Sequence, residues 1–384
     1  MRILFVFRSL AYWGGIERIL VDKMNHLVTM YDDEIFMLTT DQGNHSVPYK
    51  LDSKVHLEDL GIRIHQQYRY RGFKRWIVTW KLFRTFEKNL SERLSVIRPD
   101  VIVCTTSNYW DINVIAQIKG QVPLIVESHS ICQRTIGQGG IRNKFADYMY
   151  FRGLSHAQTI VSLTERDALE WRKIHSCVSV IPNMVYLNEG KVSSLDNKSV
   201  IWVGRLDYQK RPDEIITIWQ IVHPYFPDWH LHIYGEGEYL QIIENMICTL
   251  NMNIHIHQPT ERIFEAYRES SIFVSTSLFE PFGLVIPEAM SCGLPVVAYD
   301  CPYGPSSILS NGSNGFLVQN NNRQAFAEIL CRLMDDKNLR HQIGDKAIEA
   351  SKRFSAEKIM PLWHDLFENV ASQESKEHTF LQIE

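Results

Sequence analysis

The sequence lacks the cysteine patterns of disulfide-stapled and zinc-bound folds. Its seven cysteines are scattered, odd in number and never spaced as Cys-x-x-Cys. No apolar stretch approaches the roughly 18 residues that a membrane-spanning helix needs, and the apolar run in residues 1–7 is too short for a signal peptide. We therefore expect a cytoplasmic protein whose membrane contact, if it has one, is peripheral and at the inner face of the plasma membrane.

The chain also lacks an excess of positive charge. It has 40 Lys and Arg against 44 Asp and Glu, which gives a formal net charge of −4 at pH 7. Domains that bind nucleic acid are usually strongly basic. The balance argues against nucleic acid as a partner and implies that any basic surface is local.

Two ligand motifs are missing as well. No Asp-x-Asp sequence occurs, and the acidic pairs Asp32-Asp33 and Asp335-Asp336 do not follow a convincing buried strand. This removes the usual acidic anchor for a divalent ion on a diphosphate. No Gly-x-Gly-x-x-Gly follows the first predicted strand, which argues against a dinucleotide-dependent dehydrogenase. We expect neither a metal nor another cofactor.

What is present is a regular alternation of short runs rich in Ile, Val and Leu with longer segments of helical period. It predicts an α/β fold with parallel sheets and crossover helices. The runs form two series, separated by the polar, aperiodic residues 187–197. The predicted strands are 3–7, 34–39, 101–105, 124–127, 159–162 and 178–181 in the first series, and 200–204, 231–234, 254–257, 272–275, 295–298 and 315–318 in the second.

Each series predicts one Rossmann-like domain with its own parallel sheet. We place the first domain at residues 1–185 and the second at 186–354. Residues 355–384 would form a helix that crosses back to the first domain and then a polar, mobile tail. Its helical stripe of apolar residues consists of Ile359, Leu362, Trp363, Leu366, Phe367 and Val370.

The segment from Glu280 to Glu288, Glu-Pro-Phe-Gly-Leu-Val-Ile-Pro-Glu, joins a predicted strand to a predicted helix. The backbone N–H groups of Phe282, Gly283 and Leu284 would lie at the helix N-terminus, where unpaired donors and the helix dipole favour anionic or oxygen-rich ligands. Glu288, one turn further on the same face, can accept hydrogen bonds from vicinal hydroxyls. Glu280 would face the ligand from the strand side. The alternative is an ordinary turn flanked by two surface glutamates.

Two strand ends carry features suited to phosphate. In Gly-Arg-Leu-Asp-Tyr-Gln-Lys, residues 204–210, Arg205 and Lys210 could clamp a diphosphate and neutralise the charge that develops as it leaves. Alone, such a pair is more often a solvated salt-bridge partner. The pair Gly14-Gly15 follows the first predicted strand and opens a helix, the expected place for phosphates.

These segments resemble the retaining glycosyltransferases of family 4, the group 1 transferases with the GT-B fold. The resemblance is carried by Gly14-Gly15-Ile-Glu17, by Gly204-Arg205 with Lys210, by Tyr234-Gly-Glu-Gly237 and by the Glu-x7-Glu element of Glu280 and Glu288. It extends from about Arg2 to Phe367. The Glu-x7-Glu element with its Pro-Phe-Gly centre is the specific part.

The resemblance implies a nucleotide-sugar donor held mainly by the second domain. Arg205 and Lys210 would hold the diphosphate, Glu288 the ribose, and Glu280 with the amides of Phe282, Gly283 and Leu284 the donor sugar. Gly14 and Gly15 would complete the phosphate pocket, with Gly235 beside the nucleotide. The family also tends to place a functional histidine after a first-domain strand, and His129 in Val-Glu-Ser-His fits that position.

The implied reaction is retaining hexosyl transfer without a metal, by front-face attack of an acceptor hydroxyl. Catalysis would involve His129, Glu280, Arg205 and Lys210. A retaining glycosidase mechanism would instead need a carboxylate nucleophile. Glu280 is not assigned that role, because contact with sugar hydroxyls explains it more simply. The resemblance of Cys-Pro-Tyr-Gly-Pro, residues 301–305, to enzymes that use UDP-sugars favours UDP over GDP.

The acceptor side is indicated by a basic and aromatic segment from Arg63 to Arg93. Its cations surround interleaved aromatic residues, and only Glu87 and Glu92 oppose them. We favour an anionic membrane surface as its partner over a solvated helix with one buried face. Trp76, Trp80, Phe83, Leu90 and Leu94 share the helical face that would be buried in the second case. A glycan or lipid-linked glycan acceptor, in surface polysaccharide synthesis, follows as a hypothesis.

Two other functions fit the same motifs. A sugar-nucleotide epimerase would bind similar ligands without an acceptor. A catalytically silent partner subunit would keep the fold and lose site residues, whereas Arg205, Lys210 and the paired glutamates are all present here.

Overall fold

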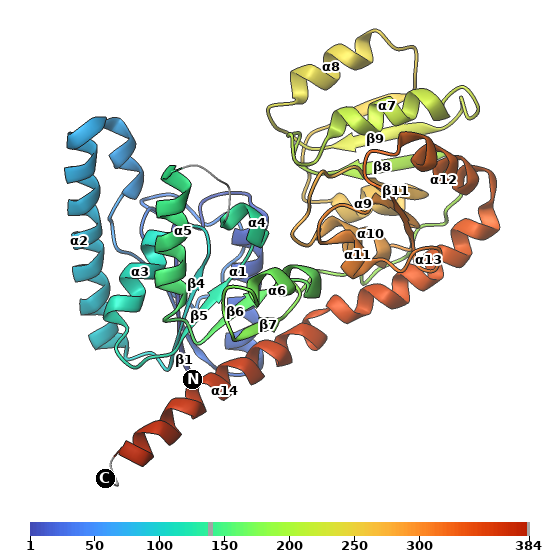
Figure 1. Ribbon diagram of the computed structural model, residues 1–384. Helices are drawn as coiled ribbons and strands as arrows, with labels where there is room; N and C mark the ends of the chain where they lie inside the picture. Colours follow the sequence, from blue (N-terminus) through green and yellow to red (C-terminus); the bar gives the residue numbers. More distant parts are fainter. Residues whose placement is uncertain (137–140, 382–384) are drawn as a thin grey trace. The chain divides into compact units, whose positions relative to one another are not determined.

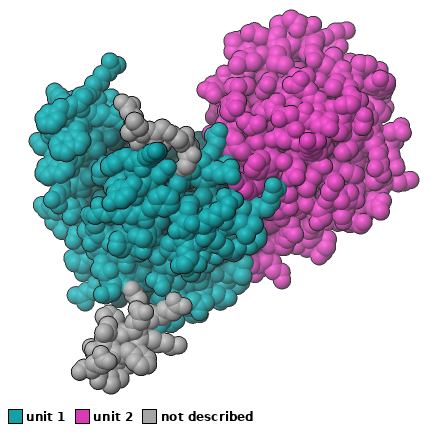
Figure 2. All heavy atoms as spheres, in the orientation of Figure 1, with its two compact units in different colours: residues 1–184, 359–384 teal, residues 185–358 magenta. Residues whose placement is uncertain are grey.

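The computed structural model describes the backbone of residues 1–136 and 141–381, and the side chains of these residues except 141–143 and 373–381. The chain divides into two compact units (Figure 2). Unit 1 comprises residues 1–184 and 359–384, and unit 2 comprises residues 185–358. Our sequence-based division placed the corresponding boundaries after residues 185 and 354.

Unit 1 contains a seven-stranded sheet of order β3-β2-β1-β4-β5-β6-β7, in which every neighbouring pair is parallel. The chain order reverses direction between β1 and β4, the position in open α/β sheets where ligands bind beyond the carboxyl ends of the strands. The strands are β1 (Arg2–Phe7), β2 (Glu34–Thr39), β3 (His56–Asp59), β4 (Val101–Thr105), β5 (Leu124–Glu127), β6 (Thr159–Ser162) and β7 (Val178–Val180).

Helices flank this sheet (Figure 1). They are α1 (Gly15–Met30), η1 (Ile64–Arg69), α2 (Gly72–Ile97), α3 (Tyr109–Ile118), α4 (Cys132–Thr135), α5 (Ile141–Leu154) and α6 (Glu165–Trp171). The long helix α14 (Ala356–Leu381) joins unit 1 from Ile359 onward. It packs there because Trp363 and Phe367 are buried and His364 stacks on Tyr31 of the α1 C-terminus.

Unit 2 contains a six-stranded parallel sheet of order β10-β9-β8-β11-β12-β13. Its strands are β8 (Ser199–Val203), β9 (His230–Tyr234), β10 (Ile254–His257), β11 (Ile272–Ser275), β12 (Val296–Tyr299) and β13 (Phe316–Val318). Its helices are α7 (Pro212–Val222), α8 (Leu240–Cys248), α9 (Ile263–Arg268), α10 (Val285–Ser291), α11 (Pro305–Ile308), α12 (Arg323–Asp335), α13 (Lys337–Ser351) and η2 (Lys352–Phe354).

The predicted α/β class with two Rossmann-like parallel sheets is confirmed, and the differences are local. Strand β3 was not predicted from the sequence. Its residues are exposed or half-buried at the edge of the sheet, so they do not form an apolar run. Helix α14 continues beyond Val370 to Leu381, because the Gln, Glu and Lys residues that we assigned to a mobile tail are also good helix formers. The rest of that tail, residues 382–384, lies outside the described residues.

Among the helices that the structure describes, none is both long enough and apolar enough to cross a membrane.

Candidate functional site

The loop after β8 is fastened to the ends of two neighbouring strands in unit 2. The amide of Gly204 donates to the carbonyl oxygen of Tyr234 at 3.1 Å, where β9 ends. The Thr276 hydroxyl, just after β11, donates to the carbonyl oxygens of Lys210 and Arg211 at 3.2 and 2.8 Å. These bonds hold residues 204–211 at the carboxyl edge of the sheet, next to the Glu-x7-Glu segment.

Lys210 and Glu280 form a nearly buried ion pair. Their side chains are 15% and 9% exposed, and the Ser277 hydroxyl also donates to Glu280 Oε2 at 3.3 Å. The backbone of Glu280 is fixed separately, because its carbonyl oxygen accepts from the amides of Tyr303 and Gly304 at 3.0 and 2.7 Å. The structure therefore joins two predicted site residues that are 70 positions apart in the sequence.

Arg205 does not join this pair. Its guanidinium contacts Asp207 Oδ2 at 3.0 Å and donates to Gln209 Oε1 at 3.2 Å, and 69% of its side chain is exposed. The two cations that we expected to act as one clamp thus lie in different environments. Lys210 is inside the site, and Arg205 is on its solvent side.

Three backbone amides next to Glu280 are free to bind a ligand. The N–H groups of Phe282, Gly283 and Leu284 have no acceptor among the described residues, and α10 begins at Val285 without a side-chain cap. Gly283 adopts φ of 95°, which favours glycine. Phe282 is buried against Phe354, with ring centroids 5.3 Å apart. The turn presents free donors on an anchored backbone, as an oxygen-rich ligand requires.

Glu288 lies further inside unit 2. It is 3% exposed, and the hydroxyl of the buried Tyr267 donates to its Oε2 at 3.3 Å. Gly235 follows β9, where a Cβ would stand 1.9 Å from the carbonyl oxygen of Gly204. Only glycine allows the ends of β8 and β9 to approach this closely.

The predicted glycine pair lies in unit 1. Gly15 is the first residue of α1, and Gly14 precedes it in an extended conformation. A Cβ on Gly14 would stand 2.0 Å from a carboxylate oxygen of Glu17, so the Glu17 side chain folds back over this residue. Burial raises the pKa of Glu17. The hydroxyl of Tyr49 donates to the Gly14 carbonyl oxygen at 3.1 Å.

His129 is 5% exposed on its side chain and belongs to a buried polar cluster with the ion pair of Glu127 and Lys23. Lys23 Nζ donates to Glu127 Oε2 at 2.6 Å. His129 Nε2 lies 3.0 Å from the same oxygen. Among the described residues, neither ring nitrogen of His129 nor Oε1 of Glu127 has a hydrogen-bond partner. The cluster thus has unused donors and acceptors.

The charges in this cluster depend on one another. Burial alone would raise the pKa of Glu127, but Lys23 and His129 outweigh burial and hold that pKa at about 2. Burial lowers the pKa of Lys23, and Glu127 opposes this shift. His129 was predicted from the sequence, whereas Lys23 and Glu127 were not. One feature of the sequence could have indicated Lys23: this lysine lies between Ile19 and Leu27 in the apolar stripe of a predicted helix, which implies a buried charge.

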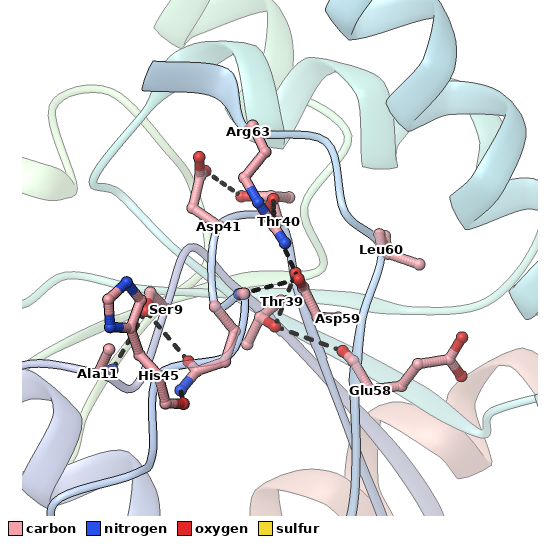
Figure 3. Close-up of polar contacts among 12 residues, drawn as sticks. Ser9, Ala11, Thr39, Thr40, Asp41, His45, Glu58, Asp59, Leu60 and Arg63 are labelled. Atoms are coloured by element: carbon pink, nitrogen blue, oxygen red, sulfur yellow. Dashed lines mark hydrogen bonds and ion pairs between the residues drawn. The ribbon is translucent and has the colours of Figure 1, made fainter. Parts of the chain in front are cut away.

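A pocket of about 430 Å³ lies after the carboxyl end of β2 in unit 1. Figure 3 shows polar contacts of Asp41, Asp59 and Arg63 beside it. Its lining residues are Asp41, Gly43, Asn44, His45, Arg63, His65 and Gln66. Arg63 donates to Asp59 Oδ2 at 2.7 Å, and His65 Nδ1 lies 2.8 Å from Asp41 Oδ1. Burial would raise the pKa of Asp59, but Arg63 and two backbone amides lower it overall. No motif of the sequence indicates this pocket.

Helix α2 exposes the first part of its aromatic stripe. Phe73, Trp76 and Trp80 are 75%, 64% and 53% exposed, whereas Phe83 and Leu90 are buried. The alternative of a buried face that Trp76 and Trp80 share with Phe83 is therefore wrong, because the buried residues of α2 begin only in its fourth turn, at Phe83. On α5, Phe145, Tyr148 and Phe151 are also exposed, and both helices contact α3.

Residues 188–350 match the family model of the glycosyl transferases group 1. A Haemophilus influenzae protein described as an uncharacterized glycosyltransferase is 25% identical over 367 residues, which cover 94% of this chain and 98% of that protein. The poly(ribitol-phosphate) alpha-N-acetylglucosaminyltransferase of Staphylococcus aureus is 30% identical over 213 residues, which cover 54% of this chain and 43% of that protein.

Two solved structures cover nearly the whole chain. A variant of S. aureus TarM in complex with fondaparinux, alpha-GlcNAc-glycerol and UDP superposes with a TM-score of 0.76 at 17% identity, covering 95% of this chain and 99% of that one. Sucrose-phosphate synthase of Thermosynechococcus elongatus gives a TM-score of 0.79 at 17% identity, covering 97% and 99%. The two Rossmann-like units therefore have the GT-B fold, and residues 188–350 match the group 1 glycosyltransferases within it.

Proposed function

We propose that this protein is a retaining glycosyltransferase that moves a hexose or N-acetylhexosamine from a nucleotide diphosphate sugar to an acceptor hydroxyl. The observation that carries the proposal is the nearly buried pair of Lys210 and Glu280 beside the three free amides of residues 282–284. This arrangement offers a cation for a phosphate, a carboxylate for sugar hydroxyls and N–H donors for the remaining oxygens. It lies within the residues that match the group 1 glycosyltransferases.

Each side chain then has a role that its environment supports. Lys210 neutralises the diphosphate, and Arg205 turns from Asp207 and Gln209 to assist it. Glu280 and the amides of Phe282, Gly283 and Leu284 hold the donor sugar. Glu288 binds the ribose hydroxyls. Gly235 lets the nucleotide approach the backbone.

The proposed reaction breaks the bond between the anomeric carbon and the diphosphate oxygen. The acceptor oxygen attacks the same face, and its proton passes to the departing diphosphate. For unit 1 by itself, we propose that Gly14 and Gly15 contact phosphate and that His129, whose ring nitrogens have no hydrogen-bond partner among the described residues, contacts the transferred sugar. No step requires a metal, because the positive charge comes from Arg205 and Lys210.

We favour UDP as the nucleotide. Support comes from the TarM complex, which contains UDP, and from the S. aureus relative, which is named as an N-acetylglucosaminyltransferase. For the acceptor we favour a glycan or lipid-linked glycan in surface polysaccharide synthesis. The pocket beside Asp41 suits a polyhydroxylated ligand, because its lining side chains offer hydrogen-bond donors and acceptors and its Arg63 is already paired with Asp59.

We also propose that unit 1 contacts an anionic membrane surface through α2 and α5. Cations of α2 accompany exposed aromatic residues, with Arg84 over Trp80 of α2 and Arg75 over Tyr68 of η1. Aromatic side chains surrounded by Lys and Arg are typical of helices that lie in a bilayer interface. Such a location would bring a lipid-linked acceptor to the enzyme.

The test of the main proposal is a thermal-shift and hydrolysis screen against UDP-, GDP- and ADP-sugars, with Lys210→Ala and Glu288→Ala alongside. We expect stabilisation by the UDP-sugars, lost in both variants and unchanged by EDTA. If UDP-sugars stabilised the protein but no acceptor gave turnover, the result would instead favour a catalytically silent partner subunit. A lack of response to every sugar nucleotide would contradict the donor site itself.

A further inference from the structure

Five aromatic rings form a zigzag stack on one face of β9 and β10. From ring to ring the order is His230, His255, His232, His257 and Tyr234, with centroid separations of 5.3, 5.0, 5.2 and 4.3 Å. The planes of successive rings differ by only 12–27°. We call the four histidines of this stack the histidine ladder.

The alternation of the two strands produces the ladder. In β9, Leu231 and Ile233 point into the core, so the two histidines between and before them point to the opposite face. In β10, Ile254 is buried and His255 is exposed. The strands are parallel neighbours, and β10 is the edge strand of the sheet. The ladder therefore lies near the edge of the sheet, on the face opposite to the one on which Leu231, Ile233 and Ile254 pack into the core of unit 2.

The ladder has two rungs, each made of one histidine from each strand. Nδ1 of His230 lies 3.0 Å from Nε2 of His255, and Nδ1 of His232 lies 2.9 Å from Nε2 of His257. With metal–nitrogen bonds of about 2.0–2.1 Å, two imidazole nitrogens at right angles around one ion are about 2.9 Å apart, against about 3.4 Å at the tetrahedral angle. Each rung therefore has the spacing of neighbouring ligands in a tetragonal site, the geometry of Cu²⁺ and Ni²⁺.

The two nitrogens of each rung are joined by a hydrogen bond, so one ring donates its N–H and the other accepts with its lone pair. For both nitrogens to bind one ion, the donor ring moves its proton to its other nitrogen. Stacking restrains the rings before an ion arrives, which lowers the entropic cost of binding.

We propose that the histidine ladder binds Cu²⁺ or Ni²⁺, one ion at each rung, with water completing the coordination. The rungs are two residues apart along the strands, about 6.6 Å, so repulsion makes the second ion bind more weakly than the first. None of the four histidines belongs to the residues assigned to the donor. The site is therefore independent of the proposed glycosyl transfer.

The test is titration of the untagged full chain with CuCl2 and NiCl2 by calorimetry, with electron paramagnetic resonance of the Cu²⁺ samples. The variants are His232→Gln with His257→Gln, His230→Gln with His255→Gln, and all four together. The matched control is His156→Gln with His341→Gln, since neither of these residues bonds to another histidine among the described residues. Circular dichroism verifies that each variant is folded.

We expect two binding events in the wild type and in the control, and one in each two-residue variant. The four-residue variant should lose at least tenfold in affinity and lose the nitrogen hyperfine splitting from imidazole. If it did not fold, the two-residue variants would still decide the matter by stoichiometry. Unchanged affinity in either rung variant, or no binding in the wild type, would overturn the proposal. None of these readouts depends on glycosyltransferase activity.

Discussion

The ring of Trp363 lies 3.4 Å from Nζ of Lys23, and this contact joins the C-terminal helix α14 to the buried cluster that contains His129. The same ammonium group bonds to Glu127. An ammonium over an indole face is stabilised by the ring quadrupole, most strongly where water is excluded. Helix α14 is therefore a part of the environment of a proposed catalytic histidine as well as a cover for unit 1.

Removing that ring should destabilise unit 1. Trp363 is 3% exposed, so Trp363→Ala leaves a cavity and an uncovered cation, and we expect a loss of about 3–5 kcal/mol in the free energy of unfolding. Urea unfolding followed by circular dichroism measures it. Leu362→Ala is the matched control on the same helix, since Leu362 is 44% exposed and should change stability by less than about 0.5 kcal/mol. Equal effects of the two variants would contradict the assigned packing.

The pair of Lys23 and Glu127 should show strong coupling. Lys23→Met leaves Glu127 buried without its cation, so we expect a loss of about 3–5 kcal/mol. Adding Glu127→Leu removes the unpaired charge, and the double variant should recover part of that loss. A double-mutant cycle by urea unfolding gives the interaction energy. Strictly additive losses would mean that the two charges do not stabilise each other.

This pair also indicates what the sequence could not predict. Except for β3, the strands of both sheets follow from apolar runs, and Lys210 and Glu280 follow from motifs within short segments. Lys23 and Glu127 are 104 positions apart, and no local pattern indicates that α1 and β5 bring them together. The pocket beside Asp41 was missed for another reason, because its lining residues flank the edge strand β3, which has no apolar run.

The histidine ladder should make stability depend on pH even without a metal ion. His232 has a pKa of about 4 in the folded protein, against an ordinary value of 6.5. Between these values the unfolded chain binds more protons, so this contribution to stability is complete above pH 6.5 and is lost as the pH falls toward 4. Urea midpoints at pH 7 and pH 4.5, with EDTA present, should differ less in His232→Gln than in the wild type. An equal decrease in both proteins would assign the acid sensitivity to other groups.

The proposed membrane surface predicts a dependence on both aromatic and basic side chains. Replacing Phe73, Trp76 and Trp80 with Ser removes exposed rings and no core packing, so folding should be unaffected. Co-sedimentation with vesicles that contain anionic lipid should fall at least tenfold, and binding to neutral vesicles should be weak for both proteins. A matched triple replacement at exposed Leu169, Tyr225 and Ile242 should leave sedimentation unchanged. Sedimentation that is unaffected by the α2 changes would rule out this helix as the contact.

The different environments of Arg205 and Lys210 predict that activity and stability respond differently to their loss. Arg205 is mostly exposed, so Arg205→Ala should change the free energy of unfolding by less than about 0.5 kcal/mol. Its proposed contact stabilises the charge that develops on the leaving diphosphate in the transition state, so kcat should fall about 100-fold. Lys210→Ala should lower kcat as well and also destabilise unit 2, because it leaves the nearly buried Glu280 without its cation.

Initial rates with the UDP-sugar that stabilises the protein, together with urea unfolding, separate these effects. Lys210→Ala combined with Glu280→Gln should recover stability and remain inactive, because the unpaired charge is removed while the phosphate contact is still missing. Full activity of Arg205→Ala would place Lys210 alone on the diphosphate. Recovered activity in the combined variant would mean that Lys210 serves only to neutralise Glu280, and the role of the diphosphate contact would then pass to the amides of residues 282–284.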